Sequence, residues 1–177
     1  MTLRPDENQA EATKGENSMK RSLVVLAFVV GAAFSSHLLA QDNPFVGTWK
    51  LNTAKSKFDP GPGPQSLTRT IVAQGSGAKY SFEGVGANGS SYAYSFSTNY
   101  DGMDSAITGT GTPGGADAIA LKRVSSRKTE GTLKKDGKEI AKVVAEVSKD
   151  GKVATVKTKG KSADGKESSS DSVYDKQ

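Results

Sequence analysis

The sequence predicts an all-β fold: an antiparallel up-and-down meander closed into a barrel of about 8–10 strands. Turn dipeptides recur through the chain after residue 41: Asn88-Gly89, Asp101-Gly102, Asp136-Gly137, Asp150-Gly151 and Asp164-Gly165. The glycines of the first two are 13 residues apart, and those of the last three follow one another at intervals of 14 residues. These dipeptides favour hairpin turns because both residues tolerate positive φ. The segments between them alternate polar and apolar residues, and no long stretch shows a 3.6-residue period. Because ten strands cannot stay flat with two open edges, closure into a barrel is favoured.

The expected strands lie near 45–52, 67–74, 78–84, 91–99, 104–108, 117–124, 128–135, 138–148, 152–159 and 171–176. The first of these opens with an apolar-rich run, and the segment 91–99 has the clearest alternation. Ile119, Leu121 and Arg123 form another stripe at every second residue. The segment 138–148 is Val-rich and lies between two Asp-Gly turns, which favours a strand over a helix.

Two connectors interrupt the meander. The segment 59–64 alternates proline with glycine, so it has too few N–H groups for a central strand, and it is expected to join the first two strands as a semi-rigid link. The segment 109–115 is rich in glycine and is expected at the rim of the barrel. Neither connector has the Lys-Ser/Thr ending of a phosphate-binding loop.

Residues 1–40 have the pattern of a secretory signal peptide. Lys20 and Arg21 precede twelve uncharged residues, and the small residue Ala40 stands at the expected cleavage point before Gln41. An uncleaved anchor is the alternative, but the apolar run is short for a membrane span. Residues 1–18 are polar and acidic, which leaves open whether Met1 or Met19 is the start. We expect an exported protein, periplasmic or secreted, with one domain over 41–177.

Composition excludes several kinds of chemistry. The chain has no cysteine, and its single histidine, His37, lies in the expected signal peptide. Disulfides, Cys/His zinc sites, thiol catalysis and Ser-His-Asp catalysis are therefore excluded from residues 41–177. Asp101 and Asp104 are a carboxylate pair that could in principle do acid–base chemistry. The presence of Asp101 is already explained by its place in an Asp-Gly turn. We predict no enzyme activity, no catalytic residue, no metal and no cofactor.

The expected domain is poor in large aliphatic side chains. Leu, Ile, Val and Phe make up about 16% of residues 41–177, below the roughly 20% at which disorder becomes plausible. The large net charge typical of disorder is missing, because the whole chain carries only +5. A barrel with many small inward residues would instead keep space inside for one small ligand.

The two ends of the domain resemble a known superfamily. Phe45-Val46-Gly47-Thr48-Trp49-Lys50-Leu51 and Val173-Tyr174-Asp175-Lys176 are similar to the ends of calycins, the lipocalins and fatty-acid-binding proteins. The longer opening, which continues through Ala54-Lys55-Ser56-Lys57-Phe58 and Pro60-Gly61-Pro62, resembles exported bacterial lipocalin-like domains still more closely. The resemblance implies a barrel that binds small hydrophobic molecules, with Gly47 and Trp49 in structural roles at one barrel end.

Two features depart from that resemblance. Fatty-acid-binding proteins have a helical lid after the first strand, and the proline-rich segment here predicts none. They also hold a carboxylate with an Arg-x-Tyr in the last strand, where this chain has Ser172 before Tyr174. Tyr174 matches and the arginine does not, which puts carboxylate binding by the last strand in doubt.

The candidate ligand-binding residues are Tyr92, Tyr94, Phe96, Tyr100, Arg123 and Tyr174. The aromatic stripe either packs as core or lines a cavity with an apolar wall and polar tips, which Tyr80 and Phe82 would extend. An inward Arg123 would hold an anionic group or close the barrel end beneath Trp49, but a slip of one residue would exchange it with Lys122.

These observations predict a monomeric, non-enzymatic protein that binds a small hydrophobic or amphipathic molecule in its lumen. The alternative is a cell-envelope interaction module without a lumen ligand, in which the lysine-rich second half of the chain meets anionic envelope components. The interleaved acidic residues of that half favour an ordinary solvated surface instead. The charge excess is too small for a nucleic-acid partner.

Overall fold

A computed structural model describes residues 43–161 and 165–177, and it confirms the all-β prediction. The expected signal peptide, residues 1–40, lies outside the described residues. The described strands are β1 (Gly47–Leu51), β2 (Lys57–Asp59), β3 (Ser66–Gln74), β4 (Gly77–Val85), β5 (Ser91–Thr98), β6 (Asp101–Ala106), β7 (Thr108–Gly109), β8 (Ala118–Ser125), β9 (Lys128–Lys135), β10 (Lys138–Val147), β11 (Val153–Lys161) and β12 (Glu167–Lys176). A single 3-10 turn, η1 (Pro113–Gly115), is the helical part of these described residues.

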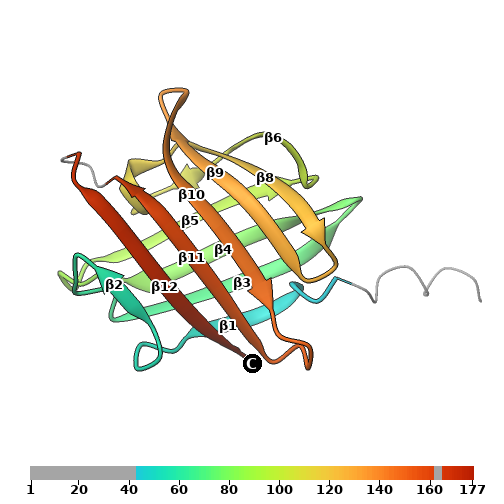
Figure 1. The fold of residues 1–177 in the computed structure, drawn as a ribbon, viewed down its shortest axis with the longest axis horizontal. Helices are drawn as coiled ribbons and strands as arrows, with labels where there is room; N and C mark the ends of the chain where they lie inside the picture. Colours follow the sequence, from blue (N-terminus) through green and yellow to red (C-terminus); the bar gives the residue numbers. More distant parts are fainter. Residues whose placement is uncertain (1–42, 162–164) are drawn as a thin grey trace, which may run out of the picture. The chain divides into compact units, whose positions relative to one another are not determined.

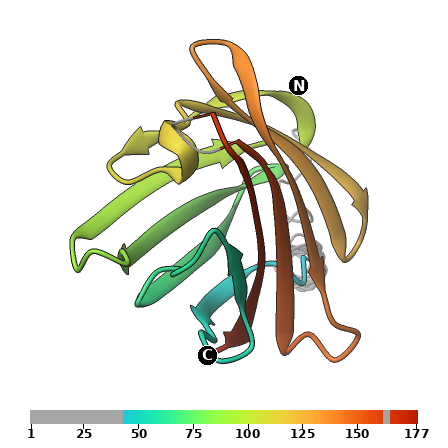
Figure 2. The same cartoon turned by 60° about the vertical axis from the view of Figure 1, so that its left-hand side comes forward.

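The strands form one antiparallel up-and-down sheet that curls into a nearly closed barrel (Figures 1 and 2). Their order is β6-β8-β9-β10-β11-β12-β1-β3-β4-β5-β7, and β2 pairs with β12. The first and last long elements of the meander meet because β1 pairs with β12, with Trp49 opposite Lys176. Consecutive β5 and β6 have no ladder between them, so the barrel wall is interrupted there.

The described residues form twelve strands where about ten were expected. The additional strands are β2 and β7, which have three and two residues, too few for an alternating pattern to be visible in the sequence. The last strand also begins at Glu167 rather than near 171. Its first residues include three consecutive serines, so no apolar alternation marks them as a strand.

The prediction of a hairpin turn at Asp101-Gly102 is wrong. The chain reverses at Asn99 and Tyr100, where Tyr100 has a φ of +59° and its N–H donates to the Thr98 hydroxyl at 3.0 Å. Asp101 already belongs to β6, and Gly102 lies in an irregularity of its ladder with β8. By contrast, Asp136 and Gly137 both have positive φ, 50° and 74°, in the tight turn between β9 and β10.

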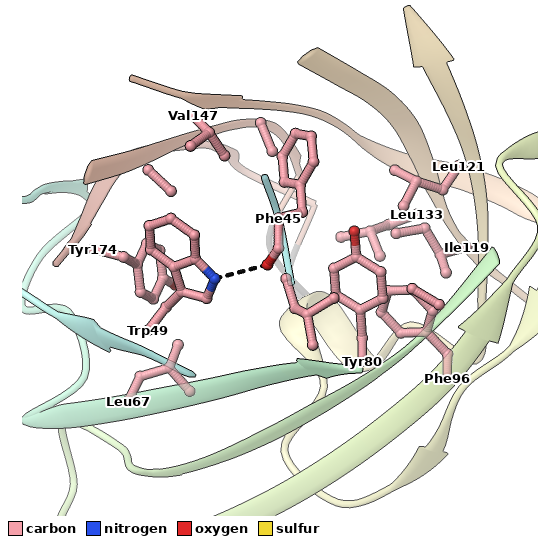
Figure 3. Packing of buried hydrophobic residues seen from close by; sticks show 14 of the residues in the cluster. Phe45, Trp49, Leu67, Tyr80, Phe96, Ile119, Leu121, Leu133, Val147 and Tyr174 are labelled. Atoms are coloured by element: carbon pink, nitrogen blue, oxygen red, sulfur yellow. Dashed lines mark hydrogen bonds between the residues drawn. The ribbon is translucent and has the colours of Figure 1, made fainter. Parts of the chain in front are cut away.

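Large buried side chains pack inside the barrel (Figure 3), and we call the end at Trp49 the closed end. Trp49 is fully buried, and its indole Nε1 donates to the Phe45 carbonyl oxygen at 2.8 Å. Ile71 of β3, Val147 of β10 and Ala154 of β11 are also almost fully buried. The opposite end is formed by loops and by the connector between β2 and β3, and we call it the open end.

Candidate functional site

The barrel encloses a cavity of about 680 Å³ that extends toward the open end. This volume lies inside the range of roughly 300–1,000 Å³ typical of small-molecule sites. The loop and connector residues that line the cavity at the open end are Phe58, Asp59, Pro60, Pro62, Gly63, Pro64, Gly86, Ala87, Gly111, Pro113 and Gly114. The glycine-rich segment 109–115 therefore lies at the barrel rim, as the sequence predicted.

One side of the cavity is an aromatic wall, which we define as Tyr80 and Phe82 on β4 with Tyr92, Tyr94 and Phe96 on β5. The sheet register places Tyr80 opposite Phe96 and Phe82 opposite Tyr94. The ring centroids of these two pairs are 4.8 and 4.5 Å apart, with nearly parallel planes. Because the rings stack on one another, the wall is a continuous apolar surface held in place by its own packing.

The phenols of the wall stay protonated at neutral pH. Burial raises the pKa of Tyr92 to about 12 and raises the pKa of Tyr80 and of Tyr94 well above the usual value. The Tyr80 hydroxyl also lies 2.9 Å from the Tyr100 hydroxyl. The wall therefore offers neutral hydroxyl groups and aromatic carbon to a ligand, and no charge.

Another part of the lining carries hydroxyl groups. Alternate residues of β12 face the cavity, so that Ser168, Ser170 and Ser172 follow one another from the open end toward Tyr174. Thr158 of β11 and Thr129 of β9 also line it. This hydroxyl strip is separated from the aromatic wall by β1 and β3 in the sheet order. A ligand in the cavity thus meets apolar rings on one side and hydrogen-bonding groups on another.

Arg69 of β3 is the one basic residue among those that line the cavity. Its side chain is 4% exposed, and its Nε and Nη2 atoms are buried without a hydrogen-bond partner. The guanidinium carbon lies 4.5 Å from the centre of the Tyr174 ring and 5.6 Å from the centre of the Trp49 ring. Burial lowers the pKa of Arg69, but a guanidinium stays charged at neutral pH.

Four of the six candidate ligand-binding residues line the cavity: Tyr92, Tyr94, Phe96 and Tyr174. Their contact with a ligand stays a prediction. Because Tyr92 lines the cavity, its side chain lies on the inner face of β5. The sequence alone had left open whether this side chain faces inward or outward. Burial raises the pKa of Tyr174, against the smaller opposing effects of Arg69 and Ser172.

Tyr100 and Arg123 are not among the cavity-lining residues and pack at the closed end. The Arg123 guanidinium carbon lies 4.2 Å from the Tyr100 ring centre and 5.6 Å from the Phe45 ring centre. The Arg123 guanidinium thus packs on these two rings, and its expected place beneath Trp49 stays a prediction. The expectation that it holds an anionic group inside the lumen does not fit this position.

Gly47 and Trp49 lie at the closed end and do not line the cavity. Gly47 has a φ of +131°, and a Cβ there would lie 2.7 Å from Cε of Lys176. The Lys176 ammonium in turn lies 5.0 Å from the centre of the Trp49 ring. A side chain at position 47 would thus displace the lysine that covers the tryptophan.

Arg69 is a charged cavity-lining residue that the sequence reasoning missed. It stands between Leu67 and Ile71 on one alternation face of its strand, so a cation on an apolar stripe was visible as a signal. Arg123 follows Ile119 and Leu121 on one strand face in the same way, and the sequence analysis names it as a candidate for that reason. Local alternation does not tell which inward residues line the cavity, and in the structure Arg69 lines it whereas Arg123 does not.

Within the described residues, no group of His, Cys, Asp and Glu side chains is arranged to hold a metal ion. Asp104 instead pairs with Lys134, whose Nζ is 2.7 Å from the carboxylate, and Asp101 accepts a hydrogen bond from the Met103 N–H. In the same part of the chain, no helix has the length and apolar character needed to cross a membrane. Neither a protein-family model nor a curated protein sequence matches this chain.

Proposed function

We propose that this protein is a non-enzymatic, monomeric binding protein that takes up one small hydrophobic or amphipathic molecule in the barrel cavity. The observation that carries the proposal is the cavity of about 680 Å³ with an aromatic wall on one side. Phe82 and Tyr94 are only half-buried although they face the barrel interior. A ligand would cover the apolar carbon that these rings leave exposed, which is favourable in proportion to its area.

The small side chains of the interior support the same conclusion. Ala141, Ala145 and Ala154 are buried on β10 and β11, where larger residues would fill the barrel. The low content of large aliphatic residues therefore leaves room in the lumen instead of producing a disordered chain. The hydroxyl strip on β12 favours a ligand with polar groups along part of its surface.

We also propose that the protein is exported and belongs with lipocalin-like domains of the calycin superfamily. The support is the signal-peptide pattern of residues 1–40 together with the Gly47-Thr48-Trp49 opening and the Val173-Tyr174 ending. The observed pairing of β1 with β12 brings these two motifs side by side.

Native mass spectrometry tests the proposed function. Residues 41–177 purified from the envelope of the producing organism are expected to carry a stoichiometric mass excess that is lost on denaturation. The purified protein should also bind the uncharged probe N-phenyl-1-naphthylamine with a rise in probe fluorescence. Tyr94→Ala should weaken this binding by about tenfold or more, since fully burying an aromatic group contributes about 1.5–3 kcal/mol.

A matched control separates this function from the lysine-rich surface alternative. Lys142, Lys157 and Lys159 lie on the outer face of β10 and β11, and replacing all three by Glu should leave probe binding unchanged. Lys142 and Lys157 already form ion pairs with Glu139 and Asp171, which reduces the free positive charge of this face. No mass excess and no probe binding, with salt-sensitive envelope binding lost in the triple variant, would contradict the lumen function.

A further inference from the structure

We propose that the ligand is an amphiphile with a carboxylate group and that Arg69 binds this carboxylate inside the barrel, a step that rests on the proposed function. The bound molecule then has its charged end beside Arg69 and its apolar part along the aromatic wall, directed toward the open end. The ligand class is thereby narrowed from any small amphipathic molecule to organic anions with an apolar body.

The first support is the unsatisfied state of the Arg69 side chain. Nε and Nη2 are buried and have no hydrogen-bond partner, although the residue lines a cavity large enough for a ligand. Buried charges are costly unless they are paired and hydrogen-bonded. The rings of Tyr174 and Trp49 contribute cation–π attraction but accept no strong hydrogen bond in the plane of the guanidinium.

The second support is the charge of the cavity lining. Asp59 is the one acidic residue that lines the cavity, and it is exposed at the open end. The ionisable groups that act on Arg69 are the phenols of Tyr174, Tyr80, Tyr94 and Tyr100, and none of them is a carboxylate. No internal carboxylate among the described residues therefore neutralises Arg69, and the site is left with one positive charge.

The third support is the placement of Arg69 relative to the aromatic wall. The sheet register sets Arg69 opposite Trp49 of β1 on one side and opposite Phe82 of β4 on the other. Phe82 is in turn opposite Tyr94, and Tyr92 follows on the same strand face toward the open end. A guanidinium forms strong charge-assisted hydrogen bonds with a planar carboxylate, so the charged end is held deep and the apolar body meets the rings.

A pair of ligands that differ only in the terminal group tests the inference. Laurate and 1-dodecanol share one alkyl chain, and the binding of each to residues 41–177 can be followed by displacement of N-phenyl-1-naphthylamine. We expect laurate to bind at least about tenfold more tightly, because hydrogen bonds to charged groups contribute about 1.5–3 kcal/mol. In Arg69→Gln and Arg69→Met, this preference should fall to about onefold while dodecanol binds as in the wild type.

Arg123→Gln is the matched control, because it removes a guanidinium that stacks on rings at the closed end and does not line the cavity. It should keep the laurate preference of the wild type. Equal binding of laurate and dodecanol by the wild type, or a preference that persists in Arg69→Gln, overturns the inference. If circular dichroism shows that both Arg69 variants are unfolded, the wild-type comparison of the two ligands still decides.

The two proposals fail in distinguishable ways. If the wild type binds laurate and dodecanol equally well, the lumen-binding function stands and only the role of Arg69 is wrong. If it binds neither ligand nor the uncharged probe, the proposed function itself is wrong. If laurate binding persists in the Tyr94→Ala variant but is lost on adding salt, the anion binds at the surface and the inference is also overturned.

Discussion

The two ends of the barrel differ in how completely their polar groups are satisfied. At the closed end, the Trp49 indole donates to Phe45, the Tyr80 and Tyr100 hydroxyls pair, and Arg123 stacks on two rings and donates weakly to the Ser126 carbonyl at 3.4 Å. Toward the open end, the lining consists mainly of small, proline or hydroxyl-bearing residues together with Phe58 and Asp59. The one cation of the cavity lining, Arg69, has two nitrogens without a hydrogen-bond partner. The comparison indicates that the closed end stabilises the fold and the cavity side is left available for a ligand.

Trp49→Ala is expected to have the largest effect on this comparison. Removing a fully buried tryptophan at the closed end should lower the free energy of unfolding by about 3–5 kcal/mol. Urea denaturation followed by far-UV circular dichroism measures the change, since Trp49 is the sole tryptophan and its fluorescence is lost in the variant. A loss below about 1 kcal/mol would contradict the assignment of stability to the closed end.

Alkaline pH should destabilise the barrel through its buried phenols. The pKa of Tyr92 rises from 10.0 to about 12 on folding, and Tyr80, Tyr94 and Tyr174 shift in the same direction. The unfolded chain therefore releases these protons first, so the stability present below pH 10 is lost as the pH rises through 12. Unfolding free energies measured at a series of pH values check this.

Tyr92→Phe provides the control for the alkaline prediction, because it keeps the ring and removes the ionisable hydroxyl. The loss of stability between pH 10 and 12 should be shallower in this variant than in the wild type. A wild-type stability that stays constant across that interval would show that the phenols are not protected by the fold.

Arg123→Ala should lower the free energy of unfolding less than Trp49→Ala does. The lost cation–π contacts with Tyr100 and Phe45 should cost about 0.5–2 kcal/mol of unfolding free energy. The affinity for N-phenyl-1-naphthylamine should not change, because Arg123 does not line the cavity. Weaker probe binding in a folded Arg123→Ala protein would mean that the two ends of the barrel are not independent.

Phe58→Ala should have the smallest effect on stability and a visible effect on ligand exchange. Phe58 is half-buried at the open end, and its ring lies against Gly63, where no Cβ would fit. We expect a stability loss of about 1 kcal/mol or less together with faster probe release in stopped-flow fluorescence. An unchanged release rate would indicate that the ligand leaves by another route, such as the interrupted wall between β5 and β6.

Much of the fold could be predicted from the sequence because its signals are local. Alternation along 91–99 and the Asp136-Gly137 turn each depend on a few adjacent residues, and both correspond to features of the structure. The same reasoning failed at Asp101-Gly102, where the ladder between β6 and β8 accommodates Gly102 as an irregularity. Whether a glycine ends a strand or distorts it depends on the partner strand.

The sequence by itself determined that this chain forms short alternating strands, that thiol and histidine chemistry are absent from residues 41–177, and that an aromatic stripe shares one strand face. Only the tertiary structure decided which arginine lines the cavity. Arg69 and Arg123 stand on similar apolar stripes, but strand pairing sets Arg69 between Trp49 and Phe82 in the cavity lining, whereas Arg123 packs on Tyr100 and Phe45 outside that lining. The physical reason is that alternation along a strand determines on which face of the sheet a side chain lies. Its neighbours inside the barrel depend on how every strand is paired.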